Sequence, residues 1–198
     1  MIKGLNQTPG ATPIDPNELE GLIPNAATQA DLNEFERLNI LVARRWAFSP
    51  RVLSREDPLA EAYQRTLHKK MFEDVWEWAG VYRTTEKNIG CLAIEITQRI
   101  PVLVGNARYW LEYGVFDLDE IAVRFHHAMV GSIHPFANGN GRHARLVADV
   151  IVVKNGRPEF TWGSSAPSAI SSVRERYLAA LAAADNGDIQ PLLKFARS

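Results

Sequence analysis

The sequence predicts an all-α protein, a helical bundle that is interrupted by one short β-hairpin. Apolar residues step along helical faces, as at Leu59, Tyr63, Leu67, Met71 and Val75 in one segment and at Ile170, Val173, Tyr177 and Leu181 in another. Asp117 and Glu120 have the spacing of a capping box, which starts a helix. Between Val81 and Glu95 the periodicity changes, and β-favouring pieces flank Asn88-Ile89-Gly90, which is typical of a hairpin tip.

Residues 1–14 are polar and rich in Pro and Gly, so we expect them to form a flexible N-terminal arm. Eight helices are expected after it, at 16–22, 29–47, 55–78, 96–113, 117–133, 140–154, 166–184 and 187–196. The β-branched run Val150-Ile151-Val152-Val153 would also suit a strand. We predict a helix there because the residues from Arg142 onward need one.

Composition limits the function classes. At 198 residues, with 46% hydrophobic residues and five Trp, the chain is expected to be one compact domain with a sizeable core. The formal net charge of −1 argues against a protein that binds the phosphate backbone of nucleic acids, because such proteins carry basic patches. We therefore expect no direct nucleic-acid binding.

Cysteine usage and hydropathy predict a location. Cys91 is the only cysteine, so an intrachain disulfide is excluded and a reducing cytoplasm is the simplest interpretation. The opening residues do not have the pattern of a signal peptide, and no apolar run reaches the ~18 residues of a membrane span. We expect a cytoplasmic protein without a membrane partner.

Residues 134–145 carry the strongest functional signal. They read His134-Pro135-Phe136-Ala137-Asn138-Gly139-Asn140-Gly141-Arg142-His143-Ala144-Arg145. His134 should lie where the preceding helix ends, because Pro135 disfavours helical backbone in the residue before it. The run from Gly139 to Gly141 can adopt backbone angles that turn its N–H groups inward as a nest for an anion.

A helix that starts at about Asn140 would add its unpaired N–H groups and a partial positive charge to this nest. Arg142 and Arg145 are three residues apart, so they share a face and can hold two successive phosphates. His134, with an ordinary pKa of roughly 6.5, can remove a proton from a hydroxyl near neutral pH. The segment predicts a polyphosphate site with a base beside it.

Each of these features alone has a simpler explanation. A single histidine at a helix end is usually structural, Gly-Asn-Gly is most often a turn, and paired arginines usually face solvent. Their combination favours the functional interpretation. The other histidines do not predict a zinc site, because no ligand spacing recurs among His68, His126, His127 and His143.

The segment resembles the signature of the Fic family, His-Pro-Phe-x-(Asp or Glu)-Gly-Asn-Gly-Arg-x-x-Arg. Similarity continues through residues 67–72, 78–83 and 176–181, so we assign 33–198 to a Fic domain. The chain as a whole resembles the small Fic subgroup called mobile mystery protein B. The resemblance implies the Fic fold, whose central buried helix would contain the run Val150–Val153.

The resemblance also implies an activity, the transfer of AMP from ATP to a Ser, Thr or Tyr hydroxyl of a target protein. His134 would be the base, and Gly139, Asn140 and Gly141 would form the anion hole. Arg142 would hold the β-phosphate and Arg145 the γ-phosphate. Doc-like kinases of the same family have Ala and Lys at the two glycine positions, so Gly139 and Gly141 favour AMP transfer over phosphotransfer.

Position 138 departs from the family pattern. Fic proteins carry Asp or Glu there to hold Mg²⁺ between the phosphates, and this chain has Asn138. The amide oxygen can coordinate the ion but lacks the negative charge that favours it. We therefore expect either a weak dependence of activity on Mg²⁺ or a need for a higher Mg²⁺ concentration. The alternative function is a nucleotide-binding regulatory module with little or no catalysis.

Two further sites are predicted from the resemblance. In the family a hairpin flap pairs with an extended segment of the target, which makes Thr84, Thr85 and Lys87 candidate substrate or nucleotide contacts. A plain surface hairpin fits the sequence equally well. Residues 15–32 form an N-terminal helical segment with a candidate inhibitory helix. There Glu20 matches the glutamate that in relatives pairs with the second arginine, here Arg145, although Pro16 replaces the usual Ser or Thr. The subgroup further implies a mobile-element setting and a helix-turn-helix partner protein.

Overall fold

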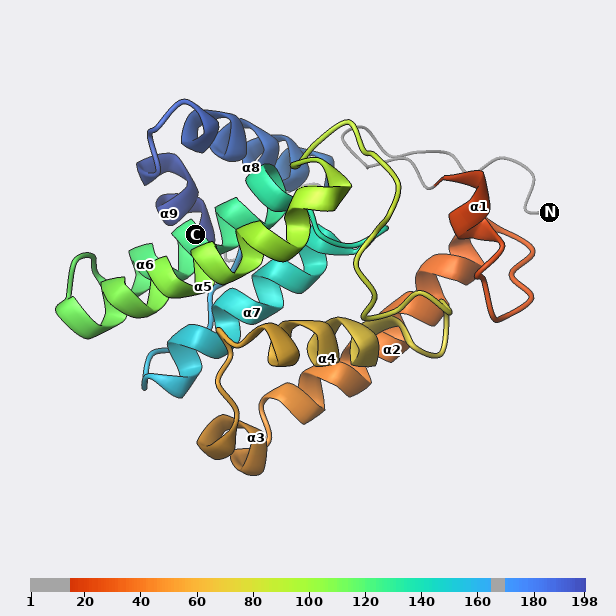
Figure 1. The fold of residues 1–198 in the computed structure, drawn as a ribbon, viewed down its shortest axis with the longest axis horizontal. Coiled ribbons are helices and arrows are strands. Elements are labelled where there is room, and N and C mark those ends of the chain that lie inside the picture. Colours follow the sequence, from red (N-terminus) through yellow and green to blue (C-terminus); the bar gives the residue numbers. More distant parts are fainter. Residues whose placement is uncertain (1–14, 165–169) are drawn as a thin grey trace.

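The computed structural model describes residues 15–164 and 170–198, and its regular elements are helices (Figure 1). In chain order they are α1 (Pro16–Leu19), α2 (Gln29–Ala47), α3 (Pro50–Arg55), α4 (Glu61–Phe72), the 3-10 helix η1 (Ala93–Glu95), α5 (Ile96–Tyr113), α6 (Leu118–His127), the π-helix η2 (Ala128–Ile133), α7 (Asn140–Lys154), α8 (Ile170–Asp185) and α9 (Gln190–Ala196). The predicted all-α class is confirmed. None of these described helices is both long and apolar enough to cross a membrane.

Helix α7 lies at the centre of the bundle, between α6 on one side and α4 on the other (Figure 1). Its apolar side chains are buried around most of its circumference, as expected for a central helix; they are Ala144, Leu146, Val147, Ala148, Val150, Ile151 and Val152. The β-branched run Val150–Val153 lies within α7, so the helix predicted there is confirmed. Burial on several sides outweighs its β-propensity.

The predicted helices 29–47, 96–113 and 140–154 have the observed bounds. The predicted helix 55–78 is wrong, because α3 and α4 are separate helices and α4 ends at Phe72. Beyond Phe72 the backbone makes tertiary contacts. The Asp74 N–H donates to the Asn39 side chain, and Trp76 forms an isolated β-bridge with Leu22. The arm 1–14 and the predicted start of helix 166–184 lie outside the described residues.

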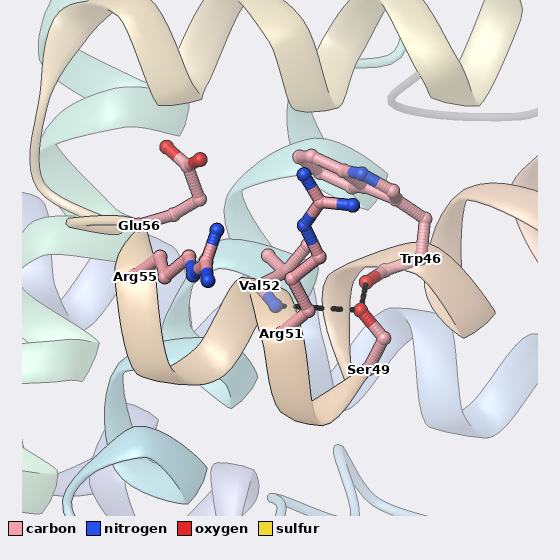
Figure 2. Close-up of a pocket in the computed structure, with 6 residues that line it drawn as sticks. All are labelled: Trp46, Ser49, Arg51, Val52, Arg55 and Glu56. Carbon is pink, nitrogen blue, oxygen red and sulfur yellow. Dashed lines mark hydrogen bonds between the residues drawn. The ribbon is translucent and has the colours of Figure 1, made fainter.

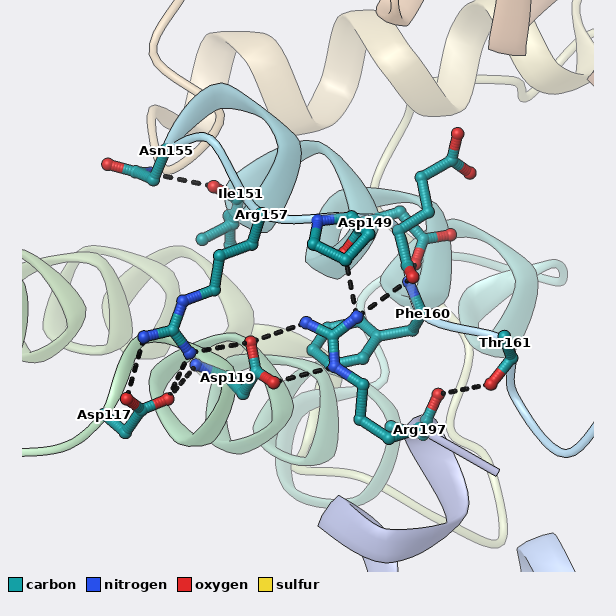
Figure 3. A network of polar contacts seen from close by, with 12 residues as sticks. Asp117, Asp119, Asp149, Ile151, Asn155, Arg157, Phe160, Thr161 and Arg197 are labelled. Carbon is teal, nitrogen blue, oxygen red and sulfur yellow. Dashed lines mark hydrogen bonds and ion pairs between the residues drawn. The ribbon is translucent and has the colours of Figure 1, made fainter.

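The start of α6 is fixed by a network of ion pairs (Figure 3). Asp119 accepts hydrogen bonds from Nε and Nη2 of Arg197 at 2.7 and 2.6 Å, and Arg157 pairs with both Asp117 and Asp119. These arginines lower the pKa of Asp119. The Asp117 cap is made to the N–H of Asp119, while Glu120 pairs with Arg124, so the reciprocal bond of the predicted capping box is absent.

Candidate active site

Helix α6 leads directly into the motif. It continues as the π-helix η2, and the N–H of His134 donates to the carbonyl of Met129, five residues earlier, at 3.0 Å. His134 has φ 52°, in the left-handed region that non-glycine residues rarely adopt. Strained backbone and π-helical turns cluster at functional sites. The helix therefore ends in a sharp turn at His134, immediately before Pro135.

The ring of His134 is held in one orientation. Its Nδ1 lies 2.8 Å from the carbonyl oxygen of Val130, so Nδ1 carries the proton and donates it to that oxygen, which leaves a lone pair on Nε2. The side chain is buried, and burial lowers the pKa of the imidazole; nearby Arg83 and Lys87 lower it further, whereas the Val130 bond opposes them. Near neutral pH the ring is therefore neutral and can accept a proton at Nε2.

The loop after His134 is anchored by Phe136 and His68. Phe136 is fully buried, and its ring stacks on that of His68 with centroids 3.7 Å apart. The Nδ1 of His68 accepts the Gly80 N–H, so its Nε2–H donates to the carbonyl of Asn138 at 3.0 Å. His68 is thus a buried neutral support for the loop, a role that sequence reasoning missed.

The glycine turn opens α7. The side chain of Asn140 closes the loop by accepting from the N–H of Phe136 at 2.9 Å and donating to its carbonyl at 2.8 Å. The N–H groups of Asn140, Gly141 and Arg142 are the first three of α7 and have no carbonyl within the helix to bind. This helix start can receive an anion, as predicted from the sequence.

The two glycines of the turn have different requirements. Gly139 has φ 79°, and a Cβ there would lie 2.4 Å from the ring of Phe72. A Cβ at Gly141 would meet only the hydroxyl of Tyr177, at 3.9 Å. The fold therefore requires glycine at 139, whereas at 141 the missing side chain leaves space at the helix start.

Asn138 takes part in this turn. Its Oδ1 accepts the N–H of Gly139 at 2.5 Å, so this N–H, predicted as a donor of the nest, already has a partner. In the described parts of the chain there is no group of three or more His, Cys, Asp or Glu side chains that could hold a metal ion. Asn138 is the one predicted metal ligand, and it offers a single neutral oxygen.

The two arginines contact different parts of the bundle. Arg142 Nη1 lies 2.5 Å from Glu36 Oε2 of α2, and its guanidinium covers the ring of Phe72 at 5.0 Å. Arg145 stacks on the ring of Tyr177 of α8 at 5.3 Å. Glu36 and Tyr177 lie far from the motif in the sequence, and nothing in the sequence pattern singled out Glu36.

The segment from Val81 to Leu92 lies against the motif loop without forming a hairpin in the structure. Its one bridge joins Tyr82 to Phe136. The buried guanidinium of Arg83 donates to the carbonyls of Thr85 and Cys91, at 2.8 and 2.6 Å. In a hairpin these backbone carbonyls would be available for pairing between the strands. The segment, which we call the flap, is thus folded around an arginine.

Arg83 also joins the flap to the motif. The side-chain Nε of Arg83 donates to the carbonyl of His134 at 2.7 Å, and the backbone N–H of Arg83 donates to the carbonyl of Pro135 at 2.9 Å. Gly90 approaches from the other end of the flap, where a Cβ would lie 2.5 Å from the Cβ of His134. Arg83 and Gly90 therefore fix the flap beside His134, and the sequence pattern did not indicate this role for either residue.

The candidate flap contacts meet the N-terminal segment. Glu18 of α1 accepts from Thr85 Oγ1 and from Lys87 Nζ, each at 2.5 Å, while Thr84 is exposed. Glu20 follows as the exposed C-cap residue of α1, and no described ion pair joins it to Arg145. The acid of α1 that contacts the site region is Glu18, and the inhibitory role predicted for Glu20 stays a prediction.

A shallow pocket elsewhere on the surface is unconnected with these residues. It has a volume of about 340 Å³ and lies where α2 meets α3 (Figure 2). Its lining comprises Trp46, Ser49, Arg51, Val52, Arg55 and Glu56. None of the predicted site residues lines it, so the motif loop and α7 remain the candidate site.

Comparison with known proteins places the motif loop within a region that matches a family model. A family model described as Fic/DOC family matches residues 58–152. The chain is 29% identical over 120 residues to protein adenylyltransferase fic-1 of Caenorhabditis briggsae, which covers 59% of this chain but only 22% of that protein. It is 26% identical over 192 residues to the "Probable protein adenylyltransferase y4lH" of Sinorhizobium fredii, with 85% and 84% covered.

Among solved structures, the chain is similar to the BepC protein of Bartonella tribocorum with bound AMPPNP. The TM-score is 0.68 at 16% identity, over 92% of this chain and 97% of that one. The matched residues 58–152 include the whole loop from His134 to Arg145 and most of α7. Residues 58–152 therefore form a Fic/DOC family domain, and the chain has the helical Fic fold.

Proposed function

We propose that this protein is an adenylyltransferase that moves AMP from ATP to a Ser, Thr or Tyr hydroxyl of a target protein. The observation that carries the proposal is the ring of His134, whose Nδ1 lies 2.8 Å from the carbonyl oxygen of Val130, so that Nδ1 carries the proton and Nε2 is the basic nitrogen. Relatives named as adenylyltransferases, and a similar fold that binds AMPPNP, support the nucleotide class.

In the proposed reaction the target hydroxyl oxygen attacks the α-phosphorus of ATP and gives its proton to His134 Nε2. A new O–P bond forms, the bond from the α-phosphorus to the bridging oxygen breaks, and pyrophosphate leaves with the electron pair. The first N–H groups of α7, together with Arg142 and Arg145, would stabilise the negative charge on the phosphates.

Mg²⁺ is implied by the family, and the side chains present fit it poorly. Asn138 Oδ1 accepts from Gly139, and the structure places no carboxylate on the motif loop itself. Mg²⁺ is commonly held by one or two carboxylates together with substrate phosphates. The protein would thus supply a neutral oxygen, so we assign no catalytic step to the ion.

The flap is the proposed contact surface for the target, through Thr84, Thr85 and Lys87. Because Glu18 contacts two of these residues, α1 would have to share or leave this surface when a target binds. A cytoplasmic location, a helix-turn-helix partner and membership of the mobile mystery protein B subgroup stay predictions. Asn138 is the residue that favours the alternative, a nucleotide-binding module with little or no catalysis.

Incubation with ATP labelled on either the α- or the γ-phosphate tests the proposal, with wild type and His134→Ala and with cell lysate as the source of target. Covalent α-label that requires His134 is expected. Label from the γ-phosphate would instead indicate a Doc-like phosphotransferase. Bound ATP without any covalent label would contradict the transferase proposal and leave the binding module.

A further inference from the structure

One buried carboxylate outside the motif contacts a motif arginine. Glu36 lies on α2, 98 positions before His134 and 106 before Arg142, and is 5% exposed. Its Oε2 lies 2.5 Å from Arg142 Nη1, and its Oε1 accepts the indole N–H of Trp76 at 2.8 Å. Each carboxylate oxygen therefore has its own partner.

This carboxylate is held firmly. Burying a charged group is costly unless it is paired and hydrogen-bonded, and here both conditions are met. Trp76 is 1% exposed, and α2, which carries Glu36, packs along α4. Because Glu36 is fixed by Trp76 and by its helix, its second oxygen determines where the guanidinium of Arg142 lies.

Arg142 keeps donors for a ligand in this arrangement. Its side chain is 35% exposed, and Glu36 takes a single N–H among the described contacts, out of the five that a guanidinium carries. The ring of Phe72 supports the planar group from one side. The remaining N–H groups can bind phosphate while the bond to Glu36 stays in place.

We propose that Glu36 is a positioning residue, which holds Arg142 in the orientation that binds the β-phosphate. The inference rests on the proposed function for the role of Arg142. A competing role, in which Glu36 blocks Arg142 and swings away when nucleotide binds, does not fit the contacts. Departure of the carboxylate would leave the buried N–H of Trp76 without its acceptor, which is unfavourable.

Glu36→Gln tests the proposal with little change in shape. A glutamine side chain has one acceptor oxygen and a donor amide, so it cannot accept from Trp76 and Arg142 with separate oxygens. The readout is the equilibrium affinity of the purified protein for ADP and for AMP, which lacks the β-phosphate. We expect the affinity for ADP to fall roughly tenfold, which corresponds to the loss of about one charge-assisted hydrogen bond. The affinity for AMP should stay within about twofold of the wild-type value.

Two further variants sharpen the measurement. Glu34→Gln is the matched control, because Glu34 lies on the same helix but is exposed and pairs with Arg37. It should leave both affinities unchanged. Trp76→Phe removes the indole N–H that fixes Glu36, together with part of a buried ring, but leaves the carboxylate to pair with Arg142. It should therefore reduce the ADP affinity less than Glu36→Gln does.

Three results would overturn the proposal. Tighter ADP binding by Glu36→Gln would mean that Glu36 competes with phosphate. Equal loss of ADP and AMP affinity, with a lower melting temperature, would mean a purely structural role. A wild type that binds ADP no better than AMP would remove the β-phosphate role of Arg142. An ADP-selective loss in a protein that transfers no α-label would support the positioning role and contradict only the transferase activity.

Discussion

The Nδ1 of His134 lies 2.8 Å from the carbonyl oxygen of Val130, four residues earlier in the π-helical turn. In a regular α-helix that carbonyl would accept the backbone N–H of residue 134. Here the N–H of His134 reaches back to Met129 instead, so the Val130 carbonyl accepts from the ring. The π-turn thus fixes the tautomer of the proposed base.

His134→Ala should abolish covalent transfer while ATP still binds, because the ring contributes a base and no phosphate contact. In the wild type the pKa of His134 is lowered from its ordinary value of 6.5 by burial. The ring must be neutral to accept a proton, so the acid limb of the pH–rate profile should lie below pH 6.5. A profile whose acid limb lies above that value would contradict the role of the buried ring.

The two glycines of the turn should respond differently to alanine. Gly139→Ala should destabilise the protein by about 2–4 kcal/mol, because the Cβ would meet Phe72 and the residue has positive φ. Gly141→Ala should change stability by less than about 1 kcal/mol, since the site is open and alanine favours helix. Urea unfolding measures both variants.

Gly141→Ala should nevertheless weaken nucleotide binding, because its methyl group would stand where phosphate approaches the start of α7. Titration with ADP checks this in a variant that folds normally. Unchanged affinity would show that phosphate does not approach Gly141.

Local signals in the sequence were sufficient for the bounds of three helices and for the motif loop, whereas the single helix predicted at 55–78 is two separate helices. The predicted ranges 29–47, 96–113 and 140–154 coincide with α2, α5 and α7, and the residues from His134 to Arg145 are contiguous. What sequence could not show depends on long-range contacts. The flap folds around the buried Arg83 rather than as a hairpin, and Glu36 reaches Arg142 across 106 positions.

Arg83→Met should both destabilise the fold and release the flap. The arginine side chain is fully buried, and its loss would leave the carbonyls of His134, Thr85 and Cys91 without this donor. We expect a cost of about 2–5 kcal/mol in urea unfolding. Arg99→Met, which removes an exposed guanidinium paired with Glu95, should cost less than about 1 kcal/mol. Similar costs for the two variants would mean that Arg83 does not hold the flap.

Asn138→Asp should lower the Mg²⁺ concentration needed for half-maximal transfer. A carboxylate at this position adds the negative charge that Mg²⁺ favours, whereas the amide offers only a neutral oxygen. The measurement is a Mg²⁺ titration of α-label transfer by wild type and variant. Superimposable titrations would show that residue 138 does not contact the ion.

Asp149 should make stability depend on pH. Burial raises the pKa of this α7 carboxyl to about 7, against the effects of hydrogen bonds from Trp162 and Phe160 and of the charge of Arg44, while Glu159 raises it further. A folded-state pKa above the unfolded value of 3.8 means that the folded protein binds the proton more tightly. Its contribution to stability is therefore present below about pH 4 and is lost as the pH rises toward about 7.

Asp149→Asn removes this titration but keeps an oxygen that can accept from Trp162. Between pH 5 and pH 7 the free energy of unfolding of the variant should therefore increase relative to that of the wild type. The difference between the two should grow by at most about 1.4 kcal/mol per pH unit. Urea unfolding at several pH values measures the difference, and its slope is informative even if loss of the Arg44 ion pair adds a constant offset. Parallel curves for the two proteins would show that Asp149 is already ionised throughout this range, held by Arg44 and the two N–H donors.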